Sequence, residues 1–373
     1  MKILMILTNP FTHDSRVYKE AKSLVNKGYN LTILAWDKTK KNPKNEKKDG
    51  INIVRSYNSK FMDLLPYSIF QLHWWWKKGY KDALKLFEKN KFNVVHCHDL
   101  SSLPIGVKLK KKFNCKLVYD AHELWAFMVK FEVPWWYYYI NLEKKLIKYV
   151  DQIITVAEPH KEWFYKMGYK KVSLVRNCKD IQKKKYYPPS NKIFTIVYIG
   201  NLKNIRFIKE AVEVCQEIKN INLKIGGYGQ LEDLLINYAN KAPYKNIEFM
   251  GKIPIENVIN KTYASDAVLC VFDPSRPNNR VGPPNKIFEA MVCGRPVIAT
   301  KGIYSGNLVE KINMGITINY NKKDFREAIT LLRDNKKLRE KFGKNALKAA
   351  ITKFNWKNQE KQLLRVYKEL NIK

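Results

Sequence analysis

The sequence predicts an α/β protein of two domains, each built on a doubly wound parallel sheet. Short apolar segments of strand length alternate with helical segments from one end of the chain to the other. Most of these segments are continuously apolar, as is typical of parallel strands that are buried on both faces. The alternation is interrupted once, at residues 178–192, and then restarts.

Length and composition fit two such domains. The 373 residues exceed one ordinary core and suit two domains of roughly 150–200 residues each, and 45% of them are apolar. The first apolar run is short and lacks a small-residue cleavage site, which indicates a buried strand and not a signal peptide. No stretch approaches the roughly 18 apolar residues of a membrane span. We therefore expect a soluble cytoplasmic protein.

The first domain is predicted over residues 1–180 and is Rossmann-like. Its strands are expected at 2–7, 30–36, 51–56, 94–98, 116–121, 152–157 and 172–177. A helical pattern, SRVYKEAKSLVNKG, follows the first strand. Residues 178–192 combine charge with a Pro-Pro pair and no apolar period, so we interpret them as a linker.

The second domain, also Rossmann-like, is predicted over residues 193–355. Its strands are expected at 195–200, 222–227, 247–251, 267–272, 296–300 and 316–319. Residues 356–373 form an amphipathic helix that we expect to pack back on the first domain. Ligands of open α/β sheets bind outside the carboxyl ends of the strands, which predicts a site in a cleft that both sheets face.

The formal net charge is +35, from 69 Lys and Arg against 34 Asp and Glu. Such an excess is found in proteins that bind nucleic acid, anionic membranes or polyanionic substrates. A general enrichment in Lys, Asn and Ile explains it equally well. RNP aromatics and zinc fingers are absent from the sequence, so we expect no nucleic-acid partner. The six cysteines form no CxxC pair, which argues against disulfides and structural zinc.

The most informative segment is residues 283–300, PPNKIFEAMVCGRPVIAT. It predicts a loop, a helix that begins near Asn285 and stops at Gly294, and a buried strand. The amino end of a helix suits a phosphate, and Lys286 adds a positive charge there. Glu289 can accept two hydrogen bonds from the vicinal hydroxyls of a ribose. On physical grounds alone, an ordinary helix with Glu289 as a solvated surface charge is an equally open interpretation.

This segment resembles the donor-binding signature of the retaining glycosyltransferases of family four, which have the GT-B fold. Glu289-Ala290-Met291, Gly294 and Pro296-Val297-Ile298 match that signature, in which the residue corresponding to Glu289 binds the nucleotide ribose. Further counterparts are NPFTHDSRVYKEAKSLVNKGY, VVHCHD, YDAHELW, LEKKLIKYVDQIITVAE and FNWKNQEKQLLRVY, so the resemblance covers nearly the whole chain. It implies transfer of a sugar from a nucleotide-diphosphate sugar to a glycan or lipid-linked acceptor, in surface polysaccharide or glycolipid synthesis.

The chain departs from the family at Val281, where members usually carry a Glu that contacts the donor sugar. Some members have an Asn-rich loop that leads into Pro-Asn-Lys, as Asn278, Asn279 and Pro284-Asn285-Lys286 do here. The sugar contacts are then expected from Asn279 or from backbone amides. The identity of the donor sugar does not follow from the motif.

A second donor segment is YIGNLKNIRFIKE, residues 198–210. Gly200 ends a strand at a point where the backbone can approach a ligand closely. In the family, a basic pair after this strand steadies the diphosphate, and Arg206 and Lys209 are expected on the first turns of the next helix for that role. Lys203 is an alternative to Lys209, and a solvated basic face is the plainer reading.

The glycines of GGYGQ, residues 226–230, resemble a nucleotide-binding cluster. In the family these glycines lie near the base, and Ile253 is expected to pack there. A dehydrogenase is the main competitor for a Rossmann-like fold. The first strand leads into NPFTHDSR without a GxGxxG pattern, which disfavours NAD.

Two loops of the first domain carry histidines at strand ends, in Cys97-His98-Asp99 and Ala121-His122-Glu123. In the family, the residue matching His122 faces the donor sugar and is needed for turnover. His98 and Asp99 are expected to shape the loop or the acceptor pocket. Asp14 and Arg16 match a pattern near the acceptor, although helix capping by Asp14 or Ser15 is an equal alternative.

The resemblance implies front-face attack by the acceptor hydroxyl, with the departing phosphate taking its proton and the anomeric configuration retained. We expect no catalytic metal, because no DxD-like cluster is present, and no cofactor beyond the nucleotide sugar. The alternatives are a non-catalytic nucleotide-sugar-binding or scaffolding protein and a sugar-nucleotide epimerase.

Residues 61–87 and 125–149 mix aromatic residues with lysines, a composition that favours the surface of an anionic membrane. Peripheral association with the inner membrane face is one expectation from this composition; packing between helix and sheet, or a dimer contact, explains the aromatics equally well. At least one of Trp74, Trp75 and Trp76 must be exposed or cover a loop, because successive helical residues turn by about 100°.

Overall fold

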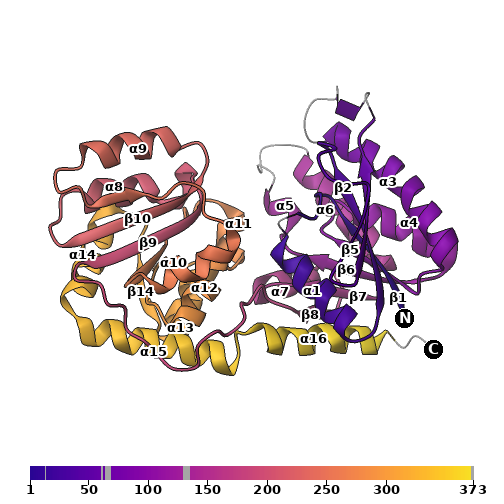
Figure 1. Cartoon of the computed structure of the whole chain (residues 1–373). Helices are drawn as coiled ribbons and strands as arrows, with labels where there is room; N and C mark the ends of the chain where they lie inside the picture. The colour runs from indigo at the N-terminus through magenta and orange to yellow at the C-terminus, as the bar shows by residue number, and fades with distance from the viewer. Residues whose placement is uncertain (13, 60–61, 64–68, 129–134, 371–373) are drawn as a thin grey trace. The chain divides into compact units, whose positions relative to one another are not determined.

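A computed structural model describes residues 1–12, 14–59, 62–63, 69–128 and 135–370 of the 373-residue chain (Figure 1). By its internal contacts the chain divides into two units. Unit 1 comprises Met1–Arg176 and Glu360–Lys373, and unit 2 comprises Asn177–Gln359. The segment interpreted as a linker thus belongs to unit 2, because Cys178 is buried in a core of that unit and Tyr187 O accepts a hydrogen bond from Arg295.

The sheet of unit 1 has the strand order β3-β4-β2-β1-β5-β6-β7-β8. Its strands are β1 (Lys2–Leu7), β2 (Asn30–Asp37), β3 (Asn45–Lys48), β4 (Ile51–Tyr57), β5 (Val94–His98), β6 (Lys116–Ala121), β7 (Gln152–Thr155) and β8 (Val172–Leu174). All neighbouring pairs are parallel except β3 and β4. The polar edge strand β3 was not predicted, because its sequence NEKK has no apolar residue.

Helices flank this sheet in unit 1 (Figure 1). They are α1 (Ser15–Asn26), α3 (Ile69–Asn90), α4 (Leu103–Phe113), α5 (Trp125–Met128), α6 (Trp135–Leu146), η1 (Ile147–Tyr149), α7 (Glu158–Lys166) and α16 (Trp356–Glu369). The last of these carries the expected apolar face, since Leu363, Val366, Tyr367 and Leu370 are buried. Helix α16 is joined to the sheet of unit 1 by a hydrogen bond of 2.7 Å between the Tyr367 hydroxyl and His96 Nδ1.

The sheet of unit 2 is parallel throughout and has the strand order β11-β10-β9-β12-β13-β14. Its strands are β9 (Phe194–Asn201), β10 (Ile221–Tyr228), β11 (Ile247–Phe249), β12 (Ala267–Cys270), β13 (Val297–Thr300) and β14 (Gly315–Ile318). Its helices are η2 (Asn204–Arg206), α8 (Ile208–Cys215), α9 (Glu232–Lys241), η3 (Ile255–Asn257), α10 (Val258–Tyr263), α11 (Pro277–Val281), α12 (Asn285–Cys293), α13 (Tyr304–Ile312), α14 (Lys322–Asp334) and α15 (Lys336–Thr352).

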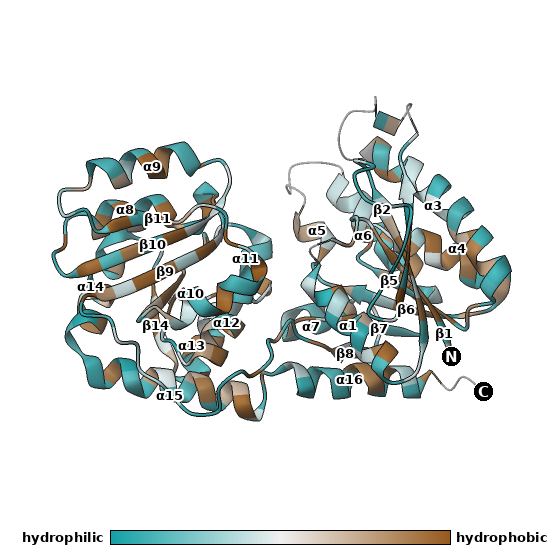
Figure 2. Ribbon diagram, viewed as in Figure 1, coloured by the Kyte–Doolittle hydropathy of each residue, from teal (hydrophilic) through white to brown (hydrophobic). Residues whose placement is uncertain are grey.

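Alternate residues of the unit 2 strands face opposite hydrophobic cores. Ile196 and Tyr198 of β9 pack in one core with residues of α8 and α14, whereas Val197 packs in the other with residues of α12 and α13. Figure 2 shows the same arrangement as apolar strands between helices with mixed faces. Because both faces are covered, the strands must be continuously apolar, which is why they were identifiable in the sequence. The predicted α/β architecture with two doubly wound sheets is confirmed.

The chain order reverses on either side of β1 in unit 1 and of β9 in unit 2. Ligands of doubly wound sheets bind outside the carboxyl ends of the strands at such a switch point. Each unit is therefore expected to bind a ligand at the residues that follow its two switch-point strands. These strands are β9 and β12 in unit 2, and β1 and β5 in unit 1.

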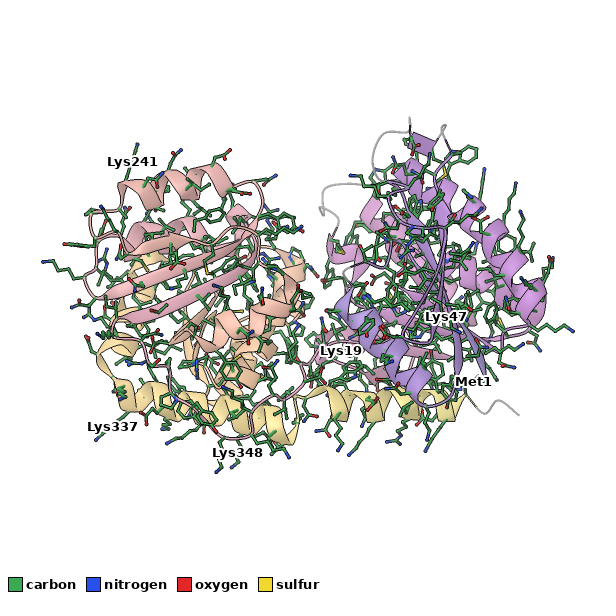
Figure 3. All side chains as sticks on the ribbon, in the orientation of Figure 1. Met1, Lys19, Lys47, Lys241, Lys337 and Lys348 are labelled. Carbon is green, nitrogen blue, oxygen red and sulfur yellow. The ribbon has the colours of Figure 1, made fainter. Side chains whose placement is uncertain are left out.

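The positive charge is carried largely by lysines that project from the surface of each unit, as Lys47, Lys241, Lys337 and Lys348 do (Figure 3). All six cysteines are free and buried, in agreement with the expectation of no disulfide framework. Within the described ranges, no helix combines the length and apolar character needed to cross a membrane.

Candidate functional site

In unit 2, glycines line the carboxyl ends of two neighbouring strands. Gly200 of β9 and Gly227 of β10 have φ angles of 154° and 143°, and a Cβ on Gly227 would lie 1.8 Å from the Gly200 carbonyl oxygen. Such a close approach of two backbones requires glycine. Gly226 is covered as expected, because a Cβ there would lie 2.6 Å from Ile253 Cγ1. The strand ends thus present bare backbone at the switch point of the sheet.

Arg206 lies at this edge, but not on the helix where the sequence placed it. It ends the short 3-10 turn η2, and α8 starts only after Phe207, whose φ of 56° breaks the helical path. The guanidinium carbon of Arg206 lies 4.2 Å from the centroid of the Phe272 ring, just after β12. Its Nη1 atom is 3.5 Å from Asn279 Oδ1, so two predicted donor residues lie together.

The nitrogen of the Asn279 side-chain amide fixes the orientation of that group. Its Nδ2 atom donates a hydrogen bond of 2.9 Å to the backbone oxygen of Asp273, which directs Oδ1 toward Arg206. Asn279 is buried within α11, the short helix that ends at Val281, the position where the family carries a sugar-contacting Glu.

Lys209 is not part of this group. Its ammonium lies 3.9 Å from Glu213 one turn along α8, and its side chain is 47% exposed. Lys203, the alternative to Lys209, is also exposed. Lys286 instead reaches the glycine-lined edge, where its Nζ atom is 2.6 Å from the position that a Cβ on Gly200 would take.

Helix α12 begins at Asn285 and ends before Gly294, which has a left-handed φ of 61°, as the sequence predicted. The Glu289 carboxylate lies 3.2 Å from Lys179 Nζ, and both side chains are only 13% exposed. Glu289 is therefore not a solvated surface charge. Lys179 was missed, because nothing in its local sequence distinguishes it from the other lysines. Asn285 Oδ1 accepts a hydrogen bond of 2.8 Å from Asn177 Nδ2.

In unit 1, the two predicted histidine loops meet, because β5 and β6 are adjacent and parallel. His98 Nδ1 lies 3.2 Å from His122 Nε2, and His122 Nε2 lies 2.9 Å from Asp120 Oδ2. The backbone N–H of His122 donates to Asp99 Oδ1 at 3.0 Å. Asp120, the last but one residue of β6, was not selected from the sequence, yet it contacts both histidines.

Asp14 and Arg16 have different roles in the structure. Asp14 caps α1, accepting a hydrogen bond of 3.1 Å from the Val17 N–H, so the capping interpretation is confirmed. Arg16 is buried, and its Nη2 atom lies 2.8 Å from Asp120 Oδ1 and 3.0 Å from Glu20 Oε1. This position favours a role in holding Asp120 over direct contact with an acceptor.

The charges of this cluster follow from burial and from the ion pairs. Burial disfavours the charged form of His122, but the Asp120 and Asp99 carboxylates outweigh it and raise its pKa to about 10. Burial also opposes the ionisation of Asp120, but Arg16 and His122 hold its pKa well below the usual value. Burial lowers the pKa of His98. His122 is therefore an imidazolium that donates Nε2–H to Asp120, while His98 is neutral.

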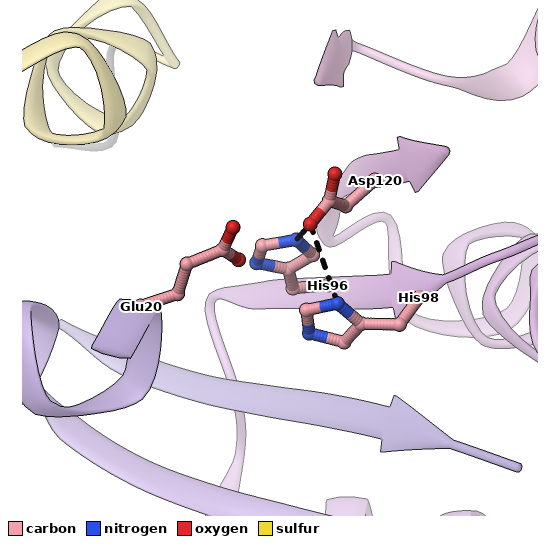
Figure 4. Close-up of side chains that lie close together, drawn as sticks. All are labelled: Glu20, His96, His98 and Asp120. Carbon is pink, nitrogen blue, oxygen red and sulfur yellow. Dashed lines mark ion pairs between the residues drawn. The ribbon is translucent and has the colours of Figure 1, made fainter. Parts of the chain in front are cut away.

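Four buried side chains of this cluster could together hold a metal ion (Figure 4). Their ligand atoms, from Glu20, His96, His98 and Asp120, lie within 4.8 Å of one another. The guanidinium of Arg16 already contacts both carboxylates. A divalent ion would lie beside this fixed positive charge, so the donor set fits a buried arginine better than a metal.

The two aromatic segments are partly outside the described residues, which omit 61, 64–68 and 129–134. Of the three consecutive tryptophans, Trp75 stacks on Trp36 with ring centroids 5.0 Å apart, and Trp76 donates to Ser101 O. Trp74 is exposed, as the helical geometry predicted. In α6, Trp135 is exposed and Tyr137 is 65% exposed. Each segment thus has both core and surface aromatics.

Comparisons with known proteins give matches along both units. The model of the family described as Glycosyltransferase Family 4 matches residues 15–183, and that of Glycosyl transferases group 1 matches residues 193–335. An uncharacterized glycosyltransferase of Methanocaldococcus jannaschii is 24% identical over 311 residues, which are 78% of this chain and 71% of the relative.

Solved structures share the fold over the whole chain. Sucrose-phosphate synthase from Thermosynechococcus elongatus aligns with a TM-score of 0.82 at 16% identity, covering 99% of each chain. Anabaena HepE in complex with UDP-glucose aligns with a TM-score of 0.73 at 14% identity, covering 99% of this chain and 100% of that protein. At these identities the likeness concerns the fold.

Proposed function

We propose that this chain, which belongs to the family-four glycosyltransferases with the GT-B fold, transfers a sugar from a nucleotide-diphosphate sugar to a hydroxyl of a glycan or lipid-linked acceptor. The observation that carries the proposal is the grouping of Arg206, Asn279 and Lys286 near glycine-lined strand ends at the switch point of unit 2, with Glu289 one turn after Lys286 on α12. A structural neighbour holds UDP-glucose, which supports a nucleotide sugar as the donor.

The residues of unit 2 suit the parts of such a donor. Arg206 can grip a phosphate with two N–H groups, and Gly200 leaves room for the Lys286 ammonium at the end of β9. Glu289 is one turn into α12 and can accept hydrogen bonds from two ribose hydroxyls. Asn279, fixed by Asp273, is the proposed contact for the sugar where Val281 replaces the usual Glu. Ile253 lies against the strand end proposed to face the base.

Unit 1 supplies His122 to the reaction. Its Nε2–H is directed toward Asp120, and its Nδ1 atom lies 3.7 Å from Asp99 Oδ2, beyond hydrogen-bond distance, so Nδ1–H is the donor proposed to reach a substrate. A histidine with a pKa of about 10 is protonated at neutral pH and cannot accept a proton there. This supports a mechanism in which the departing phosphate takes the proton of the acceptor hydroxyl, with attack on the same face and retention of configuration.

The negative charge that develops on the leaving diphosphate needs fixed positive groups. Arg206 provides one within the donor site, and a transfer that uses side-chain cations in this way does not need a metal. We accordingly propose metal-independent catalysis, in which activity survives chelation by EDTA. Loss of activity with EDTA and its recovery with Mg²⁺ or Mn²⁺ would overturn that part of the proposal.

A role at the inner membrane face, in the synthesis of a surface polysaccharide or glycolipid, is proposed for unit 1. Exposed Trp74, Trp135 and Tyr137 lie on helices that also carry lysines, and the net charge is +35. Aromatic side chains favour the membrane–water boundary, and lysines favour anionic headgroups. Such a surface suits a lipid-linked acceptor.

One observation favours a second candidate, a nucleotide-sugar-binding protein without turnover. Val281 cannot make the polar contact to the sugar that the family's usual Glu makes. Thermal-shift measurements against UDP, GDP, ADP, CDP and their sugars distinguish the outcomes when combined with an assay for nucleoside diphosphate release. Stabilisation with release supports transfer, and stabilisation without release by any sugar supports the binding protein. No stabilisation by any of these compounds contradicts both.

A further inference from the structure

We propose that the Lys286 ammonium, and not that of Lys209, is the second cation that holds the donor diphosphate beside Arg206. The inference rests on the proposed function, because it assigns a residue within the donor site of a transferase. The family pattern gives this role to a lysine after β9, whereas we assign it to a lysine at the start of α12.

Lys286 and Arg206 both approach the Phe272 ring. The Lys286 Nζ atom lies 4.3 Å from the centroid of the Tyr198 ring and 5.9 Å from that of Phe272. The Arg206 guanidinium carbon lies 4.2 Å from the same Phe272 ring. Lys286 Nζ also reaches within 2.6 Å of the Cβ position at Gly200, so any larger residue there would displace it. Two cations thus gather around one aromatic ring at the end of β9.

Within the part of the chain that the structure describes, no carboxylate forms an ion pair with either cation. Among the described residues, no ion pair or hydrogen bond is formed by the Lys286 ammonium, and the neighbouring Glu289 is paired with Lys179 at 3.2 Å. Two like charges close together and partly shielded from water repel each other. A bound diphosphate would relieve that repulsion, because it brings negative charge to both cations.

Lys209 lacks these features. Its partner Glu213 also pairs with Lys322 and accepts a hydrogen bond of 3.2 Å from the Tyr238 hydroxyl. The ammonium of Lys209 is thus solvated and lies within a network on the surface of α8. Bringing it to a ligand would require it to leave that network.

The protonation of Lys286 provides a specific signature. Burial and the positive charge of Arg206 lower the pKa of Lys286 to about 8, although the Glu289 carboxylate opposes this shift. The other titratable groups that face it are neutral near that pH, since burial raises the pKa of the Cys270 thiol to about 12 and that of Tyr198 further. A diphosphate would stabilise the ammonium and raise its pKa, so binding near pH 8 must take up protons.

The test is titration calorimetry of the full chain with UDP, and with GDP, ADP and CDP if UDP does not bind, in two buffers of different ionisation enthalpy. Phosphate groups with a second pKa of about 6 are already ionised at pH 8, so they contribute no uptake there. With a free pKa of about 8, Lys286 should take up about 0.5 proton per nucleotide at pH 8 and about 0.9 at pH 9.

Three variants separate the two lysines. Lys286→Met should weaken binding about 10- to 100-fold and abolish the uptake, since a charge-assisted contact is lost. Lys286→Arg should bind without uptake, because a guanidinium stays charged. Lys209→Met is the matched control and should keep both the affinity and the uptake of the wild type.

The outcomes distinguish this inference from the function it rests on. If a nucleoside diphosphate binds without proton uptake, or if Lys209→Met loses the uptake and Lys286→Met keeps it, the assignment of Lys286 is wrong while the donor site stands. If none of the nucleoside diphosphates binds to the wild type, the proposed function itself falls.

Discussion

Replacing Glu289 by alanine should strongly weaken the binding of a nucleoside diphosphate. The carboxylate is 13% exposed and lies one turn into the helix, where it can accept two hydrogen bonds from a ribose. Each charge-assisted hydrogen bond contributes about 1.5–3 kcal/mol, so losing even one weakens binding about 10- to 150-fold.

The ion pair with Lys179 must be separated from this effect. Glu289→Ala leaves the Lys179 ammonium largely buried without its partner, which lowers the free energy of unfolding as well. Lys179→Met is therefore the matched control: it breaks the same ion pair but keeps the carboxylate. We expect it to retain most of the nucleotide affinity, whereas Glu289→Ala loses it.

The assay is titration calorimetry with the nucleoside diphosphate that binds the wild type, at a temperature where circular dichroism shows both variants folded. Glu289→Gln should fall between the two, because its amide keeps one neutral acceptor. Unchanged affinity in folded Glu289→Ala, or an equal loss in Lys179→Met, would refute the assignment of Glu289 to the ribose.

The other predictions concern unit 1. His122→Ala should reduce kcat by at least about 100-fold with little change in donor affinity; normal turnover in steady-state assays would show that His122 is only structural. Because the pKa of His122 is raised from 6.5 to about 10 in the folded protein, its stabilising contribution is complete below pH 6.5 and is lost as the pH rises through 10. Urea unfolding at pH 7 and at pH 10 should therefore show a smaller decrease between the two pH values for His122→Ala than for the wild type, and an equal decrease would contradict the raised pKa. In sedimentation with anionic vesicles, Trp135→Ser combined with Tyr137→Ser should reduce the bound fraction at low salt, whereas neutral vesicles should bind little of either protein; full recovery of the wild type in the supernatant under all conditions would exclude the membrane surface.

The architecture was predictable because its signal is local. A strand that is covered on both faces is largely apolar, so the cores of β1 and β12 stand out as continuous apolar runs. The edge strand β3 carries no such signal, because it pairs on one side only and reads NEKK. Its place depends on a turn through Asp49 and Gly50, both with positive φ angles, which brings it back against β4.

The candidate site was predictable in part, for a related reason. A motif such as the segment around Glu289 identifies residues by their position at a strand end or a helix start. Such positions are determined by the local sequence. The partner of a charge is fixed by the tertiary structure. Lys179 is distant in sequence from its partner Glu289, and Asp120 is 104 residues from its partner Arg16, so neither was identified.

Arg206 and Lys209 illustrate the same limit. They are three residues apart, so a helix that ran through both would place them on one face. Phe207, which has a left-handed φ of 56°, separates the 3-10 turn that ends at Arg206 from the helix that carries Lys209. Nothing in the sequence marks this buried aromatic residue as one that adopts a positive φ. The result is that Arg206 contacts Phe272 while Lys209 points into the network of Glu213.

Proton NMR of the reaction tests the proposal that the chain transfers a sugar with retention of configuration. The wild type, Arg206→Ala and Glu289→Ala would be incubated with nucleotide-diphosphate sugars and a panel of glycoside and lipid-linked acceptors, while the anomeric proton of the product is followed. We expect release of a nucleoside diphosphate by the wild type, a product with the anomeric configuration of the donor, and strongly reduced release by both variants. A product of inverted configuration, or tight nucleotide-sugar binding without release for every acceptor, would contradict the proposal.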